Sequence, residues 1–485
     1  MVRKNTVAPL ARDFSARAIA AETDPRAKLG APAGAGVRAN APAPAAVLIV
    51  NGPIFTGGAD FALLDGHGLL LEDGRVAKIA PTEELTSEGA RRIDARGKLV
   101  MPGLINAHMH FYSTLVRGLG KAAPAHDFNG VLRNLWWRLD RKLTLEDTYY
   151  SALVMMLAAV RRGTTTLIDH HASPGAILGS LERIARAGSE TGLRIGLAYE
   201  ISDRDGAQAA AEGLAENAAA VRFCREQGGE HLRGLVGLHA SFTLSDETLA
   251  RATALAADLG VGCHIHAAEA ASDQEDCLAR HGVRVVERLR RAGILGPKTI
   301  AAHAVHVDRS EIETLAAAGT MVVHNPQSNL NNAVGIADIV AMKAAGVLVG
   351  LGTDAMTVNM LEELRVALWA QHYGRRDPAQ GFMEATGALF SGNPAIAERI
   401  WGLPLGRIRE GGPADVILVD YDPPTPLDAG SVLGHLVFGV SQSAVDTTIV
   451  AGRVLMENKA LKLDIDEERV AARSRELAAA LWQRF

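Results

Sequence analysis

The sequence predicts an α/β protein, a (β/α)8, TIM-like barrel joined to a small β-sandwich domain that is built from both chain ends. Between residues 101 and 400, short apolar runs alternate with segments rich in Ala, Leu, Arg and Glu, as parallel strands alternate with helices. Six or more of these runs end in His, Asp or Glu, and barrels carry their chemistry at the carboxyl ends of the strands. Short β-rich runs broken by Gly and Asp occur near both ends of the chain. An open, doubly wound sheet is the alternative to the barrel.

The first segment, residues 1–45, differs in texture from the rest of the chain. It is rich in Ala, Arg and Pro, as in "APAGAGVRANAPAPAA", and we expect a disordered leader. A targeting peptide is the alternative, because arginines recur and aromatic residues are nearly absent. Asp13, Glu22, Asp24 and the lack of an apolar stretch argue against it.

The remaining segments follow in order. Residues 46–101 contain "AVLIVNGPIFTGG" and "GLLLEDGRVAKIA", and residues 404–460 contain "PADVILVDYD" and "VDTTIVAGRVLMENK". Two chain ends with the same short-strand texture predict one composite β-sandwich domain. Residues 102–403 would then form the barrel. Residues 461–485, which contain "DEERVAARSRELAAALWQRF", predict an amphipathic C-terminal helix.

Composition excludes several functional classes. Of 485 residues, 48% are hydrophobic and 22% charged, and the net charge of -5 is small, so neither nucleic acid nor an anionic membrane is indicated as a partner. No apolar run approaches the ~18 residues that span a bilayer. The three cysteines, Cys224, Cys263 and Cys277, are too few for a disulfide framework and too irregularly spaced for a CxxC metal site. We therefore expect a cytoplasmic protein.

Two histidines follow a Pro-Gly turn in "VMPGLINAHMHFYS". Because side chains at positions i and i+2 share one face of a strand, His108 and His110 both point into the predicted barrel. A buried metal would supply partners for two imidazoles, whereas an ordinary pair of core histidines is the alternative. The pair alone does not distinguish a metal site from an ordinary pair of core histidines. Other predicted strands also end in candidate ligands, however, among them Asp354 in "LGTDAMTVN".

Two neighbouring strands add further candidates. "CHIHAAE" places His264 and His266 at a strand end, with Glu269 one turn later. His266 lies nearer the strand end and is the better placed ligand, while His264 is expected to lie deeper and to support the ligands. "AAHAVH" offers His303 and His306. We prefer His303 because it ends the apolar run, whereas His306 falls in the following turn.

Taken in order, "PGLINAHMH", "HIHAAE", "AAHAVH", "HNPQSN" and "GTDAM" resemble the amidohydrolase superfamily, in its deaminase and chlorohydrolase (ATZ/TRZ-like) branch. The resemblance covers residues 46 to about 458. Within the branch, "GTTTLIDHHASP", "NLWWRLDRKLTLED" and "GTDAMTVNMLEE" are similar to the SsnA-type aminohydrolases. The resemblance implies a homodimer and one divalent metal ion, Zn2+ in the first place and Fe2+ as the alternative. The implied metal ligands are His108, His110, His266 and Asp354, and the implied catalytic residues are Glu269, His303 and Asp354.

A single metal ion is expected for a further reason. Binuclear members of this superfamily bridge two metals with a carboxylated lysine at the end of the fourth strand. The counterpart here, "LRGLVGLHASFT", offers His239 and no lysine. By resemblance His239 contacts the substrate, and a role in supporting the metal ligands is the alternative.

The residue types predict attack of a metal-bound hydroxide on an electron-poor ring carbon, and the resemblance implies a metal-dependent aminohydrolase that deaminates a nitrogen heterocycle of purine, pyrimidine, pterin or triazine type. Asp354 would take the proton of the water, His303 would stabilise the developing charge on oxygen, and Glu269 would carry a proton to the ring nitrogen and the leaving amine. A cyclic amidohydrolase that opens the ring with the same water is the alternative. A catalytically inactive scaffold is a third hypothesis, against which the complete ligand set argues.

Substrate contacts are harder to place from sequence. Arg117 could meet an anionic or carbonyl group, or it could simply hold a loop. Trp136 could stack on a flat heterocycle, but adjacent residues on a helix point in different directions, so at most one of Trp136 and Trp137 is expected to do so. Of the two histidines after "TTTLID", we prefer His170 over His171 as a contact at the barrel mouth.

The run "HNPQSNLNN" follows another predicted strand. We expect it to form a loop at the barrel mouth. Ser328 and Asn329 would either line the site or cap the helix that follows, and the sequence leaves both interpretations open.

Overall fold

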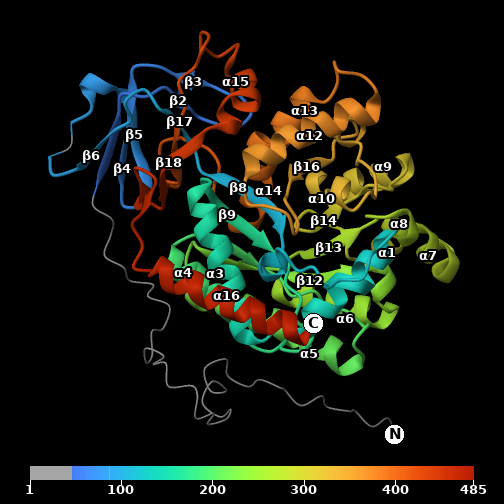
Figure 1. Ribbon diagram of the computed structural model, residues 1–485. Coiled ribbons are helices and arrows are strands. Elements are labelled where there is room, and N and C mark those ends of the chain that lie inside the picture. Colours follow the sequence, from blue (N-terminus) through green and yellow to red (C-terminus); the bar gives the residue numbers. More distant parts are fainter. Residues whose placement is uncertain (1–45, 87) are drawn as a thin grey trace, which may run out of the picture.

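The computed structural model describes residues 46–86 and 88–485 (Figure 1). The predicted leader, residues 1–45, lies outside these described residues. The described chain is a mixed α/β protein in which parallel strands alternate with helices. One parallel sheet has the order β11-β10-β9-β8 and the other has the order β12-β13-β14-β15-β16. Their strands are β8 (Leu104–Met109), β9 (Thr164–Asp169), β10 (Arg194–Leu197), β11 (Leu232–Gly234), β12 (Val236–Ala240), β13 (Cys263–Ala267), β14 (Ile300–His303), β15 (Met321–His324) and β16 (Leu348–Leu351).

The expected fourth strand of the barrel is interrupted at Leu235. β11 pairs with β10 and β12 pairs with β13, so the hydrogen bonding defines two sheets rather than one eight-stranded sheet. Two isolated parallel bridges connect the sheets, Met109 with Asp354 at one side and Ile201 with Leu238 at the other. Gly237 permits the second approach, because a Cβ atom there would lie 2.3 Å from the carbonyl oxygen of Tyr199.

Helices follow most of the strands and cover the sheets (Figure 1). Sequence signals mark where two of them begin, since α3 and α9 each start with a capping box in which an N-cap side chain and an acidic side chain three residues later bond reciprocally. The main helices are α3 (Leu145–Arg161), α4 (Ser180–Thr191), α5 (Ala207–Gln227), α6 (Asp246–Leu259), α7 (Ala271–His281), α8 (Val285–Arg291), α9 (Arg309–Ala318), α10 (Pro326–Asn331), α11 (Ile339–Ala344), α12 (Met360–Arg375), α13 (Phe382–Gly387) and α14 (Asn393–Trp401).

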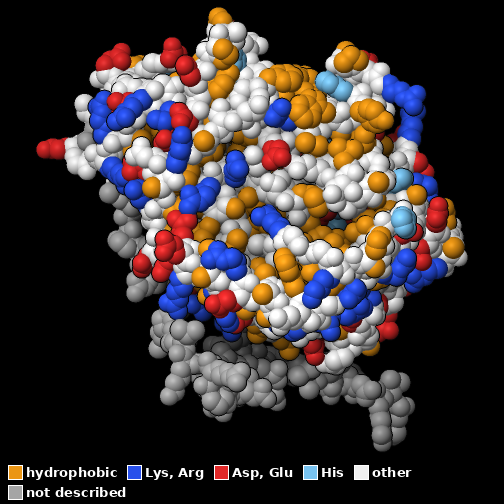
Figure 2. Space-filling view, viewed as in Figure 1, with side chains coloured by type: hydrophobic (Ala, Val, Ile, Leu, Met, Phe, Trp, Pro, Cys, Tyr) orange, Lys and Arg blue, Asp and Glu red, His pale blue; other side chains and the backbone are white. Residues whose placement is uncertain are grey.

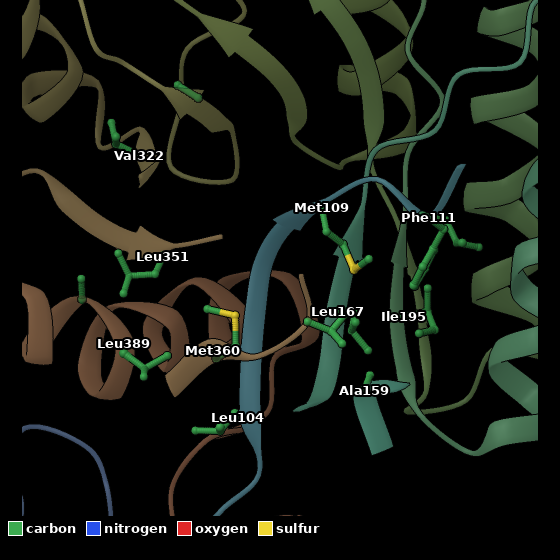
Figure 3. Packing of buried hydrophobic residues seen from close by; sticks show 14 of the residues in the cluster. Leu104, Met109, Phe111, Ala159, Leu167, Ile195, Val322, Leu351, Met360 and Leu389 are labelled. Carbon is green, nitrogen blue, oxygen red and sulfur yellow. The ribbon is translucent and has the colours of Figure 1, made fainter. Parts of the chain in front are cut away.

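The core lies between the strands and these helices. Figure 3 shows Met109, Leu167 and Ile195 on three neighbouring strands, with Ala159 of α3 and Met360 of α12 in the same buried cluster. Each fully buried Leu or Ile stabilises the fold by roughly 1.5–3 kcal/mol relative to an exposed one. This layer fixes the strands so that their carboxyl ends meet at one side of the molecule.

Strands from both chain ends form two further sheets, and they lie together as blue and red arrows in Figure 1. A seven-stranded sheet has the order β20-β19-β18-β17-β7-β2-β3, and a four-stranded sheet has the order β5-β4-β1-β6. The two sheets share one buried cluster that includes Ile49, Leu69, Val416 and Ile449. Their strands are β1 (Val47–Val50), β2 (Ile54–Phe55), β3 (Leu63–Leu64), β4 (His67–Glu72), β5 (Arg75–Pro81), β6 (Arg91–Asp94), β7 (Leu99–Pro102), β17 (Val416–Asp420), β18 (Ala444–Val450), β19 (Arg453–Glu457) and β20 (Ala460–Leu461).

Two features tie the small sheets and the C-terminus to the rest of the fold. Arg194 at the start of β10 is fully buried, and it donates from Nε and Nη2 to the two carboxylate oxygens of Asp415 at 2.7 and 3.0 Å. Such a planar, bidentate pair fixes geometry as well as charge. The predicted C-terminal helix is α16 (Glu467–Arg484), which packs along α3 and buries Leu477 and Leu481.

Two further observations concern the surface. Lys, Arg, Asp and Glu side chains are interspersed over the face shown in Figure 2, as the small net charge leads one to expect. None of the helices in residues 46–86 and 88–485 combines the length and the apolar character that crossing a bilayer requires.

Candidate active site

Four side chains from three strand ends converge at the carboxyl side of the sheets. β8 and the residue after it present His108 and His110, β13 presents His266, and Asp354 follows β16. The Oδ1 atom of Asp354 lies 2.8 Å from Nε2 of His110 and 3.6 Å from Nε2 of His108. The Nε2 atoms of His110 and His266 are 3.3 Å apart. The structure therefore brings together all four residues that were predicted to be metal ligands.

Hydrogen bonds to Nδ1 orient the three imidazoles. Nδ1 of His108 bonds to Nε2 of His264 at 2.8 Å, which places His264 deeper in the core, as expected. Nδ1 of His110 and of His266 bond to backbone carbonyl oxygens, those of His170 and His239. All three Nε2 atoms therefore face the common centre. Nε2 of His108 is buried and has no hydrogen-bond partner among the described residues.

This donor set fits a divalent metal. His108, His266, His303 and Asp354 each offer a ligand atom, and these atoms lie within 4.8 Å of one another. His110 belongs to this centre through its contact with Asp354. Imidazole nitrogens combined with a carboxylate oxygen are ligands that zinc prefers, and ligating histidines usually have their second nitrogen hydrogen-bonded, as here.

Burial and neighbouring charges set the protonation of the centre. Burial lowers the pKa of His108 to about 3, so this imidazole is neutral. Burial acts in the same direction on His110, but the carboxylates of Asp354 and Glu200 outweigh it and raise its pKa to about 9. Burial alone would raise the pKa of Asp354, yet the adjacent imidazoles hold it well below its ordinary value. The centre therefore contains a permanently ionised carboxylate.

Glu269 and His303 lie beside the ligands. Oε2 of Glu269 is 3.5 Å from Nε2 of His303, and Nδ1 of His303 bonds to Oδ1 of Asn329 at 2.8 Å. The hydroxyl of Ser328 donates to Oδ2 of Asp354. Burial and the negative charge of Asp354 raise the pKa of Glu269 well above its ordinary value. Glu269 is thus suited to hold a proton. Ser328 and Asn329 lie in α10 rather than in the expected loop, and their side chains contact Asp354 and His303, so of the two alternatives the structure favours residues that line the site.

The backbone is strained where these side chains leave their strands. Ala268, His303, Ala304 and Asp354 have φ angles of 49°, 73°, 51° and 51°. Non-glycine residues adopt this left-handed region at a cost of roughly 1–2 kcal/mol each. Such strain clusters at functional sites, where the surrounding structure holds side chains in directions that a relaxed strand would not give them.

A pocket of about 650 Å3, including its open mouth, lies above the centre. Trp136 and Trp137 both line it, and the expectation that at most one of them stacks on a substrate stays a prediction. A π-helical turn, Leu132–Trp136, runs directly into α2 (Trp137–Leu139). The ring of Trp136 packs near Tyr112 and that of Trp137 near His239, so the two tryptophans form different walls. The other lining residues include His110, Asp140, Glu200, His266, Glu269, Ser328, Asn332 and Asp354.

Three further residues had been predicted to contact substrate. His239 lines the pocket. Arg117 does not, because it follows a short 3-10 helix, is exposed, and points its guanidinium at the sulfur of Met155. His170 also stays outside the pocket lining, because its ring is fully buried and stacks on His264 with centroids 4.2 Å apart.

Sequence reasoning missed two acidic residues of the pocket, Glu200 and Asp140. Glu200 ends the run "LRIGLAYE", so the rule that polar strand ends carry the chemistry could have found it. Asp140 follows the tryptophans and forms an ion pair with Arg204. No motif connects residues 64 positions apart, and their pairing depends on the fold.

Comparison with known proteins shows relatives over nearly the whole chain. Residues 99–455 match the model of the Amidohydrolase family. A 5-methylthioadenosine/S-adenosylhomocysteine deaminase from Desulforudis audaxviator is 32% identical over 443 residues, which cover 90% of this chain and 97% of that protein. A 5'-deoxyadenosine deaminase from Methanobrevibacter smithii is 31% identical over 435 residues, 88% of this chain and 96% of that protein.

Solved structures share the fold. A crystal structure of an adenosine deaminase from Xanthomonas campestris with bound zinc matches with a TM-score of 0.79 and 24% identity, covering 91% of this chain and 99% of that one. An atrazine chlorohydrolase from Arthrobacter aurescens TC1, complexed with zinc, matches with a TM-score of 0.76 and 23% identity, covering 89% and 100%.

Proposed function

Because this chain belongs to the amidohydrolase family, we propose that it is a metal-dependent aminohydrolase that removes an amino group from a nitrogen heterocycle and releases ammonia. The observation that carries the proposal is the convergence of His108, His110, His266 and Asp354, with every Nε2 atom directed at one point below an aromatic-walled pocket. Two relatives of this chain are named as deaminases, which hydrolyse a carbon–nitrogen bond.

One divalent ion would be held by these four residues, Zn2+ in the first place and Fe2+ as the alternative. When bound, such an ion lowers the pKa of a water molecule and so makes a nucleophile available at neutral pH. The hydrogen bonds at Nδ1 of the histidines keep the second nitrogens aimed at the ion.

The remaining steps are proton transfers among the residues of this chain. Asp354 is ionised and its Oδ2 is held by Ser328, so Oδ1 can accept the proton of the attacking water. Glu269 holds a proton that it can give to a ring nitrogen. The carboxylate so formed can then pass on to the departing amine the proton that the attacking water gave up, and the hydroxyl proton left on the product restores Glu269. Nε2 of His303 is buried without a hydrogen-bond partner among the described residues. Because Nδ1 donates to Oδ1 of Asn329, Nε2 stabilises charge on the incoming oxygen once it has taken up a proton.

The names of the relatives make purine nucleosides the first substrates to test. The metal-loaded protein should be incubated with purines, purine nucleosides, pyrimidines, pterins, triazines and hydantoins, and ammonia release and ring absorbance should be scored separately. We expect ammonia without loss of the ring. Loss of the ring would instead identify a cyclic amidohydrolase, and a metal-loaded protein that changes none of these compounds would contradict the proposal.

Removal of the metal should abolish activity and lower thermal stability. Dialysis against a chelator leaves Asp354 and the imidazoles without the metal ion that they share. A ligand that binds only the folded state, present at ~100 times its Kd, stabilises the fold by about 2.7 kcal/mol, so loss of the metal removes a contribution of this size. The melting temperature and the rate of ammonia release should fall together and return on addition of Zn2+. Mg2+ is the control ion, because it disfavours imidazole ligands and should restore neither property.

Several structural proposals accompany this function. We infer that the two parallel sheets act as one closed (β/α)8 barrel over residues 102–403, which the bridges at Met109 and at Leu238 support. We likewise infer a β-sandwich from the shared core of the two small sheets in residues 46–101 and 404–460. The homodimer, the cytoplasmic location and the finer similarity to SsnA-type aminohydrolases stay predictions.

A further inference from the structure

One side of the pocket is formed by a single short segment, residues 128–142, which lies between β8 and α3 and is called the outer wall below. It consists of α1 (Phe128–Val131), the π-helical turn, α2 and a 3-10 turn (Asp140–Lys142). Helical pieces this short are not stable alone, because nucleation costs more than their few hydrogen bonds return. The outer wall is therefore held in place by what packs against it. It contributes five of the residues that line the pocket, Phe128, Leu132, Trp136, Trp137 and Asp140.

Trp136 packs on two sides. On one side it contacts the cluster that contains Leu132. On the other side it contacts a cluster that contains Tyr112 together with Leu477 and Leu481 of α16. The rings of Tyr112 and Trp136 meet edge to face, with centroids 6.0 Å apart, and both residues line the pocket. The C-terminal helix thus packs behind two aromatic side chains of the pocket.

The last turn of α16 also holds the segment that leads into the outer wall. Nε1 of Trp482 donates a hydrogen bond to the carbonyl oxygen of Leu115 at 2.8 Å. The carbonyl oxygen of Trp482 accepts a hydrogen bond from Nζ of Lys121 at 2.9 Å. Leu115 and Lys121 both precede the outer wall in the chain, so these bonds fix the path by which the chain enters it.

Two further residues at this end of α16 hold the outer wall itself and the helix that follows it. The guanidinium of Arg138 in α2 lies 4.2 Å from the centroid of the Phe485 ring and donates to the backbone oxygen of Phe485. Nη2 of Arg484 lies 2.7 Å from Oδ2 of Asp147, at the start of α3. A cation over an aromatic ring and a hydrogen bond between charged groups both stabilise one particular geometry.

We propose that Trp482, Arg484 and Phe485, called the clamp below, are positioning residues that set the place of the outer wall and so determine how tightly substrate binds. This inference rests on the proposed function and adds to it a determinant of affinity outside the pocket. None of the three belongs to the described residues that line the pocket. The candidate metal ligands and proton carriers come from strand ends on the sheets, so a shift of the outer wall should weaken binding and leave the chemical step intact.

Two substitutions in the clamp test this division. Trp482→Ala removes a ring and a donor, and Phe485→Ala removes the ring beside Arg138. With the zinc-loaded protein and adenosine as the probe, each should raise KM roughly tenfold and change kcat by less than about threefold, at unchanged zinc content. Phe485→Tyr keeps the aromatic face and should restore the native KM. Trp369→Ala, at an exposed position of α12, is the matched control and should leave KM unchanged.

The fold should survive these substitutions, because α16 has other contacts with the rest of the chain. Nε and Nη2 of Arg473 donate to the two carboxylate oxygens of Glu146, each at 2.9 Å. Leu477 and Leu481 stay buried in every variant. The melting temperature of each variant checks that the helix remains docked.

Hydrogen–deuterium exchange gives a second measurement that needs no substrate. In the zinc-loaded Trp482→Ala variant, amides in peptides that cover residues 128–142 should exchange about tenfold faster than in the native protein, because local opening of the outer wall is then easier. Peptides from β8 and β13 should keep their native protection. The Trp369→Ala control should exchange like the native protein throughout.

The outcomes separate the clamp from the proposed function. A native KM and native exchange in Trp482→Ala and Phe485→Ala would overturn the inference and leave the proposed aminohydrolase intact. Faster exchange over the whole chain, or a fall in kcat at unchanged KM, would also overturn it. Absence of ammonia release from every heterocycle would contradict the proposed function, whereas faster exchange confined to residues 128–142 would still support the clamp.

Discussion

Asp354→Asn should lower kcat/KM for ammonia release by at least about 10³-fold, because it removes both a charged metal ligand and the proton acceptor. The amide keeps the shape of the side chain but cannot take a proton from water. The substitution also removes the negative charge that raises the pKa of His110 and that accepts a hydrogen bond from the hydroxyl of Ser328. Ammonia release and the zinc content of the purified variant, determined by elemental analysis, are the measurements.

The fold of this variant should survive, which makes its result interpretable. Asn adopts the left-handed region more readily than most residues, so the φ of 51° at position 354 is tolerated. Asp60→Asn, at an exposed position, is the control for a generic loss of charge. Full ammonia release by Asp354→Asn would contradict the roles of Asp354 as proton acceptor and as an essential metal ligand.

Glu269→Gln should lower kcat by roughly 10²- to 10⁴-fold while leaving zinc bound, because proton transfer to the ring and to the leaving amine is lost. The pKa of Glu269 is raised by burial and by Asp354, so the native residue carries the proton that Gln cannot release. The penalty should be smaller for a chloro-substituted ring than for the corresponding amine, since chloride leaves without a proton. Rates with both leaving groups are compared in the variant and in the native protein.

Glu275 is an exposed residue of α7, close in sequence to Glu269. Glu275→Gln is therefore the control for a change from Glu to Gln that does not touch the pocket. If Glu269→Gln lost zinc in proportion to activity, Glu269 would be a metal ligand and the assignment of the proton carrier would be wrong. An equal penalty for chloride and amine leaving groups would restrict Glu269 to protonation of the ring.

Local rules predicted the centre of the site well. The two-residue periodicity of a strand places His108 and His110 on one side, and their rings lie 4.9 Å apart. The same rule, combined with the position of the strand end, distinguished His266 in the pocket from His264 behind it. These assignments succeed because they depend only on the direction in which a strand points its side chains and on the fact that parallel strands end together.

Features that depend on contacts between distant segments could not be predicted. Whether Arg117 faces the pocket or Met155 depends on how a short helix packs on α3, and nothing local encodes that choice. The interruption at Leu235 arises because β11 and β12 pair with different sheets. Glu200 followed the rule for strand ends, but its place in the pocket wall near His239 depends on contacts between strands that no local pattern encodes.

The seven-stranded sheet combines strands from both chain ends, which matters during synthesis on the ribosome. β7 pairs with β17, although β17 leaves the ribosome about 300 residues later, which at ~5–20 residues per second is roughly 15–60 s. During that interval β2, β3 and β7 have no completed sheet, and an unpaired strand edge is a site for association with other chains. Nascent chains should therefore depend on chaperones more than their modest charge and apolar content suggest, and C-terminal truncations before β17 should aggregate rather than fold as a shorter enzyme.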